Sequence, residues 1–128
     1  MIDEHLDEIE KIIKDDHLVI FSDFQRICTS QNTAFIKAKI RFIDNSFLSI
    51  FHHVHDENGL FSFDYRYHYI DSKNTMIFRY DNAPHHPEVQ SFPHHKHTTV
   101  EIKESEMPNI RDILSEIHHH IIKGLLSK

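Results

Sequence analysis

The chain has 128 residues, enough to bury a core without metal or disulfide bonds, and we expect one domain over residues 1–128. A single cysteine excludes an intramolecular disulfide, and no stretch approaches the roughly 20 apolar residues of a membrane span, so we expect a cytoplasmic protein without a membrane partner. The formal charge of −6 argues mildly against nucleic acid as a partner, but each of the 14 histidines that gains a proton weakens this objection.

The N-terminal half of the chain predicts one helix followed by strands. Isoleucine and leucine recur at helical spacing in residues 2–15, with acids early and lysines late, which predicts an amphipathic helix. From residue 18 to residue 81 the apolar period changes to two, as in half-buried strands. Polar breaks divide this region into five strands, and they fall at residues 31–32, 44–46, 56–59 and 71–74.

The C-terminal part predicts a short strand and a second helix. Residues 98–102 suit an edge strand, and an apolar stripe from Ile110 to Leu125 predicts a helix introduced by Pro108 and Asn109. We therefore expect an α+β fold, in which a five-stranded antiparallel β-meander carries the N- and C-terminal helices on one face.

Loops centred in the polar breaks give a strand register. They place Ile40 opposite Ile50, Ile50 opposite Tyr65, and Tyr67 opposite Phe78, all on the helix-covered face. His52 also falls on that face, where we expect a core histidine, and we expect Cys28 to be buried.

The opposite face is then polar and carries more basic than acidic residues. In the predicted register, Arg66 lies opposite Arg79, and Asp64 lies opposite Asp81. Such a face suits a phosphate backbone, although open antiparallel sheets commonly have a solvated face with no function. The residues expected to hold RNA here are Lys37, Lys39, Arg41, Arg66 and His68.

Residues 80–97 form the most unusual segment, with five histidines, three prolines and two acids. Prolines restrain the backbone, so the imidazoles lie on a stiff path. Histidine transfers protons near neutral pH, and two imidazoles beside a phosphodiester can act as base and acid while a cation stabilises the developing charge. We expect His94, His95 and His97 to share these roles, Arg79 and Lys96 to stabilise charge, and Asp81 to orient a histidine. His85 and His86 are expected to bind substrate.

Two other interpretations of this segment remain open. Imidazoles with Asp81 or Glu88 could bind a metal ion, but the spacing matches no standard zinc signature, so our first interpretation includes no metal and no cofactor. The histidines could also hold the loop against the sheet by hydrogen bonds alone. Three consecutive histidines, His118 to His120, cannot converge on one ion from a helix and are expected mostly on its surface.

The histidine-rich segment also resembles a known family. Arg-Tyr-Asp-Asn-Ala-Pro-His-His-Pro-Glu-Val at residues 79–89 and Phe-Pro-His-His-Lys-His at residues 92–97 are similar to the signature of the TumE family, small toxins of prokaryotic toxin–antitoxin pairs. The resemblance extends over most of the chain and includes the Tyr-Arg-Tyr-His-Tyr strand at residues 65–69. It implies a cognate antitoxin and marks the five loop histidines as signature positions, but implies no established mechanism.

Most small toxins of such pairs act on RNA, so the resemblance favours a ribonuclease. Our first hypothesis is a metal-independent endoribonuclease that uses histidine acid–base chemistry. The alternative is a non-enzymatic protein that binds metal or a partner through the histidine-rich loop. Phe35 and Phe51, expected on the polar face, are candidates for the surface that the antitoxin or a second copy in a homodimer covers.

Overall fold

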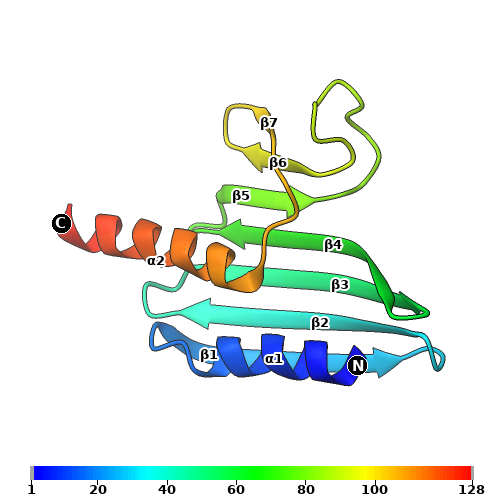
Figure 1. The fold of residues 1–128 in the computed structure, drawn as a ribbon. Coiled ribbons are helices and arrows are strands. Elements are labelled where there is room, and N and C mark those ends of the chain that lie inside the picture. The colour runs from blue at the N-terminus through cyan, green and yellow to red at the C-terminus, as the bar shows by residue number, and fades with distance from the viewer. Residues whose placement is uncertain (1, 128) are drawn as a thin grey trace.

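A computed structural model describes residues 2–127 and shows an α+β fold with one sheet (Figure 1). Both helices lie on the same side of that sheet. In chain order the elements are α1 (Ile2–Lys14), β1 (Val19–Cys28), β2 (Thr33–Phe42), β3 (Phe47–Glu57), β4 (Leu60–Ile70), β5 (Met76–Asp81), β6 (His95–Thr98), β7 (Ile102–Glu104) and α2 (Ile110–Leu126).

The sheet is an antiparallel meander whose strands follow one another in chain order from β1 to β7. The predicted fold class and both helices are confirmed, but the sheet has seven strands rather than five. The expected edge strand at residues 98–102 is wrong, because most of these residues form the turn of the β6–β7 hairpin. In that turn the Thr98 backbone N–H donates to the carbonyl oxygen of Glu101 at 2.9 Å.

The predicted register is displaced by two residues in each of the three hairpins tested. Ile40 lies opposite Leu48, and Tyr69, not Tyr67, lies opposite Phe78. In the third hairpin, Ile50 lies opposite Tyr67 and not opposite Tyr65. Each turn contains an asparagine in the left-handed conformation, and these asparagines move the turn centres by one residue; they are Asn45, Asn58 and Asn74.

A shift of two residues leaves every side chain on its predicted face, because strand side chains alternate with a period of two. It does change the partners on the open face. Arg66 lies opposite Asp81 and His68 lies opposite Arg79, so the like-charge pairs expected from the sequence do not form.

The core lies between the sheet and the two helices. The two helices bury Leu6 and Ile13 of α1 and Ile113, Ile117 and Ile121 of α2 against the sheet. Burial of each such side chain contributes on the order of 1.5–3 kcal/mol. The face beneath them carries mainly apolar and tyrosine side chains, including Ile36, Ile40, Leu48, Val54, Tyr65, Tyr67, Tyr69 and Phe78.

Polar contacts fix the position of each helix on the sheet. Arg26 of β1 donates to a carboxylate oxygen of Asp7 in α1 at 2.8 Å. The side chain of Asn109 caps α2 by accepting the backbone N–H of Asp112 at 2.9 Å, as the predicted Pro108–Asn109 start requires. His118 Nε2 lies 2.6 Å from an Asp16 carboxylate oxygen, at the end of the α1 segment.

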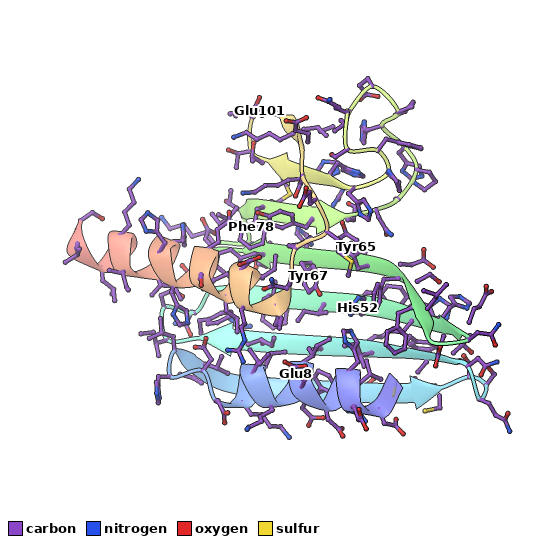
Figure 2. All side chains as sticks on the ribbon, viewed as in Figure 1. Glu8, His52, Tyr65, Tyr67, Phe78 and Glu101 are labelled. Atoms are coloured by element: carbon purple, nitrogen blue, oxygen red, sulfur yellow. The ribbon has the colours of Figure 1, made fainter. Side chains whose placement is uncertain are left out.

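Two of the single-residue expectations have opposite outcomes. Cys28 is exposed at the end of the edge strand β1, so its predicted burial is wrong. His52 is buried as expected, and its side chain, which is labelled in Figure 2, lies on the helix-covered face. Neither ring nitrogen of His52 has a hydrogen-bond partner among residues 2–127. Within that same range, the structure contains no helix that is both long and apolar enough to cross a membrane.

Candidate active site

The site forms where β5 and β6 pair on the open face. Arg79 lies opposite His97, and Asp81 lies opposite His95. Because alternate residues of a strand share a face, these four side chains converge on the side of the sheet that the helices leave uncovered. All four are site residues predicted from the sequence, and the structure brings them together.

Asp81 is the centre of this group. One carboxylate oxygen, Oδ1, lies 2.9 Å from His95 Nε2 and accepts the backbone N–H of Ala83 at 3.1 Å. The other, Oδ2, accepts Nε–H of Arg79 at 3.0 Å and lies 3.6 Å from His97 Nε2. The Asp81 and His95 side chains are almost fully buried, so this carboxylate is paired and hydrogen-bonded as a buried charge requires.

His95 has an acceptor at each ring nitrogen. Its Nδ1 lies 2.8 Å from the carbonyl oxygen of Pro93, while its Nε2 faces Asp81. A carbonyl and a carboxylate can only accept, so both nitrogens must donate to satisfy the two contacts. His95 therefore has no ring nitrogen free for a substrate.

His97 has the opposite environment. Its Nε2 lies 2.9 Å from Nη2 of Arg79, which can only donate, so Nε2 is the acceptor and the ring is neutral. Burial lowers the pKa of His97 below its usual 6.5, and the Arg79 guanidinium lowers this pKa further, against the opposite effect of Asp81. The site therefore contains one imidazole that faces a donor, His97, beside one that faces two acceptors, His95.

The loop between β5 and β6 adds a third imidazole. The ring centroid of His86 lies 5.1 Å from that of His95 and 5.5 Å from that of His97. Its Nδ1 lies 3.0 Å from a carboxylate oxygen of Glu88. The pKa of Glu88 is lowered by a backbone hydrogen bond and by His86. This contact leaves Nε2 of His86 as the ring nitrogen available to a ligand.

These side chains border an open pocket of about 560 Å³ on the sheet face. His85, Lys37 and Arg66, all predicted to bind substrate, also line this pocket. Lys39, Arg41 and His68 lie on the same face but outside the lining, and Arg41 instead donates to the carbonyl oxygen of Asn45 at 3.0 Å. Burial and the nearby guanidinium groups of Arg79 and Arg66 lower the pKa of His68.

Two residues assigned to catalysis from the sequence lie away from this group. Lys96 Nζ lies 2.7 Å from a carboxylate oxygen of Glu116 in α2, on the helix-covered face. His94 Nδ1 lies 2.9 Å from the hydroxyl oxygen of Tyr65, and the two rings are stacked. Both side chains therefore hold the β6 segment to the rest of the fold.

Sequence reasoning missed two residues that shape the pocket. Asn82 anchors the start of the loop, because its Nδ2 donates to the Phe63 carbonyl oxygen at 2.7 Å and its Oδ1 accepts the Tyr65 N–H at 3.0 Å. Its place directly after Asp81 in the signature was the available signal. Phe51 lines the pocket and was considered only as a contact surface for another protein.

Among residues 2–127, two trios of side chains have ligand atoms within 4.8 Å of one another and could hold a metal ion. One consists of the three site imidazoles, His86, His95 and His97. Arg79 opposes a cation there, because its guanidinium already contacts His97 Nε2. The other trio lies farther along β3 and β4 and consists of His53, His55 and Asp64.

A comparison with family models identifies the chain. The model described as Toxin TumE matches residues 9–125, nearly the whole chain and all of the site. No curated protein and no solved structure matches this sequence. The match extends far beyond the histidine-rich signature into both helices and every strand. The chain belongs to the TumE toxin family.

Proposed function

We propose that this toxin is an endoribonuclease that cleaves RNA without metal at the pocket formed by β5, β6 and the loop between them. One observation carries this proposal: Nε2 of His97 accepts a hydrogen bond from Nη2 of Arg79 at 2.9 Å, while the ring centroid of a second imidazole, His86, lies 5.5 Å from that of His97. Cleavage through the RNA's own 2′-hydroxyl requires a base, an acid and a cation for the developing charge. Family membership supports the toxin role, and the nuclease activity is the proposed part.

His97 is the base in this proposal. Entry of a phosphate draws the Arg79 guanidinium toward the phosphate oxygens and frees the lone pair on His97 Nε2. That nitrogen takes the proton of the 2′-hydroxyl while the 2′-oxygen attacks phosphorus. Arg79 then stabilises the negative charge that develops on the phosphate oxygens.

His86 is the acid in this proposal. Its Nδ1 lies 3.0 Å from a carboxylate oxygen of Glu88, so Nε2 faces the pocket side free of this contact, and its side chain is partly exposed at the pocket. Nε2 gives its proton to the 5′-oxygen as the bond between phosphorus and that oxygen breaks. The products are a 2′,3′-cyclic phosphate and a free 5′-hydroxyl. His95 is buried with both nitrogens occupied, so it serves as a positioning residue with Asp81.

Membership of this family implies a cognate antitoxin as partner. In the proposed role, the toxin cleaves cellular RNA when the antitoxin is absent and growth stops. A cytoplasmic location, where RNA is available, is part of the proposal.

The test is cleavage of a long single-stranded RNA by untagged protein, in parallel reactions with EDTA and with added zinc. We expect cleavage that survives EDTA, ends in a cyclic phosphate and is lost in His97→Ala. His119→Ala is the matched control, because this exposed histidine of α2 lies outside the site. Cleavage that requires metal, or that persists in His97→Ala, would contradict the proposed chemistry.

A second candidate function is metal binding without catalysis. The observation that favours it is the convergence of the three imidazoles, His86, His95 and His97, within 4.8 Å. Imidazole nitrogens at this spacing suit zinc or a similar transition metal. Zinc titration of untagged protein separates the two candidates: tight binding that is lost in His86→Ala, with no RNA cleavage, would favour the metal-binding role.

A further inference from the structure

The open face of the sheet carries phenylalanines among its cations, next to the proposed site. Both helices pack on the other side of the sheet, so the structure leaves this face uncovered over β1 to β4 (Figure 1). Phe35 of β2 and Phe51 of β3 form a pair there, with ring centroids 6.1 Å apart. Both rings are only partly buried, so part of each aromatic face is accessible to a ligand on this side of the sheet.

Phe51 lies between two cations. Its cross-strand partners are Lys37 on β2 and Arg66 on β4, and all three side chains line the pocket. Lys37, Lys39 and Arg66 are exposed, and among the residues that the structure describes they form no ion pair with a carboxylate. The protein as a whole is acidic, with a formal charge of −6, so unpaired cations around an aromatic ring favour an anionic ligand that also has flat apolar surfaces.

Single-stranded nucleic acid has this combination of chemical groups. Its unpaired bases stack on aromatic side chains, while cations along the same groove contact the phosphates. A duplex buries its bases and would present only its backbone to such a sheet. We propose that the open face binds single-stranded RNA, with bases stacked on Phe51 and Phe35 and phosphates on Lys37 and Arg66, and that it directs the strand into the pocket at Arg79 and His97. This inference rests on the proposed ribonuclease function and names its substrate.

The test measures binding in a protein that should not cleave. In the His97→Ala background, fluorescence anisotropy compares a short labelled single strand with the same sequence in a duplex. We expect the single strand to bind more tightly, and Phe51→Ala to weaken its binding at least about fivefold, as the loss of one stacked base requires. Phe51→Leu keeps apolar bulk without the aromatic face and should weaken binding similarly in a stably folded protein, while Phe51→Trp should restore it.

Phe61→Ala provides the matched control. Phe61 is an exposed phenylalanine that stacks on His5 on the opposite side of the sheet, so its loss should leave RNA affinity unchanged. Equal affinity of the Phe51→Ala and parent proteins for the single strand, or equal affinity of the parent for duplex and single strand, would overturn the inference. The inference would also be overturned if Phe51→Ala weakened binding of the antitoxin but left RNA binding unchanged, because the face would then be a protein interface.

The inference and the proposed function fail in different ways. RNA binding that depends on Phe51, without cleavage by the unsubstituted protein, would support the binding face and contradict the nuclease. Cleavage whose KM and RNA affinity do not change in Phe51→Ala or Phe51→Leu would support the nuclease and contradict the binding face.

Discussion

The state of His97 depends on one neighbouring side chain, Arg79. The guanidinium donates to His97 Nε2 at 2.9 Å, and its charge, together with burial, lowers the pKa of His97 below 6.5. A base is active in its unprotonated form, so the cleavage rate should rise with pH, and the midpoint of this rise should lie below pH 6.5. In a cleavage assay from acid to neutral pH, an acid limb above pH 6.5 would contradict this assignment.

Replacement of Arg79 tests the same dependence directly. Arg79→Gln removes the nearby positive charge, so the protonated form of His97 becomes less unfavourable and its pKa should rise. NMR titration of the His97 ring should show its midpoint at higher pH than in the unsubstituted protein. Arg111→Gln, at an exposed position of α2, should leave the His97 titration unchanged. An unchanged midpoint in Arg79→Gln would show that burial alone sets this pKa.

Asp81 has a structural role that is separate from chemistry. Its carboxylate is the buried counter-charge of both His95 and Arg79. Asp81→Asn would remove the buried negative charge that Arg79 and His95 contact, and we expect a loss of about 3–5 kcal/mol in the free energy of unfolding. Asp64→Asn, on the same face but largely exposed beside His53, should change stability by less than about 0.5 kcal/mol. Similar urea midpoints for the two variants would show that the Asp81–His95 ion pair does not form.

Part of this site follows from strand periodicity. The period of two places His95 and His97 on one face, and the same rule places Lys96 on the other, where it binds Glu116. The prediction nevertheless groups all three with His94, because it places residues 80–97 in one loop. That residues 95–98 form a strand paired with β5 depends on long-range hydrogen bonds, which local patterns in the sequence do not reveal. The ion pair of Asp81 and the contact of His86 with the other imidazoles depend on that pairing.

At the scale of secondary-structure elements, turn residues limited the accuracy of the prediction. Each hairpin break was recognised from its polar residues, but the turn centre depends on which residue adopts a positive φ. Asn45, Asn58 and Asn74 have φ values of 66°, 53° and 66°, and these positions moved every predicted pair by two residues. Each side chain was still assigned to the correct face of the sheet. The core and the basic face could therefore be predicted, although the cross-strand partners could not.

The start of α2 follows from a local signal, and its contribution to stability can be measured. Asn109 accepts the backbone N–H of Asp112 at 2.9 Å, which satisfies one of the free donors of the first turn. Asn109→Ala should lower the free energy of unfolding by about 1 kcal/mol, while Asn109→Asp keeps an acceptor and should cost much less. Equal destabilisation of the two variants in urea unfolding would indicate that the packing of Asn109, not its cap, matters.

At the scale of the whole molecule, the helix-covered face of the sheet places a titratable side chain inside the core. This side chain is His52, which is 1% exposed. His52 stacks on Phe63 with ring centroids 5.0 Å apart, and neither ring nitrogen has a partner within the described part of the chain. Burial lowers the pKa of His52 to about 4, with a smaller effect of His5 in the same direction.

This lowered pKa makes the fold sensitive to acid. The unfolded chain binds a proton at His52 near pH 6.5, but the folded chain does so only near pH 4, so the unfolded state gains protons first as the pH falls. The contribution of His52 to stability is therefore complete above pH 6.5 and is lost progressively down to about pH 4. A displacement of this size corresponds to about 3 kcal/mol.

Replacement of His52 by an aromatic residue without a charge isolates this effect. His52→Phe keeps the ring against Phe63 but cannot be protonated, so its free energy of unfolding should fall less steeply between pH 6.5 and pH 4. The comparison uses the slope of stability against pH from urea unfolding, because the absolute stability also changes with packing. His119→Phe, on the exposed side of α2, should retain the slope of the unsubstituted protein. If His52→Phe and the unsubstituted protein lose stability in parallel between pH 6.5 and pH 4, then the acid sensitivity does not arise from His52.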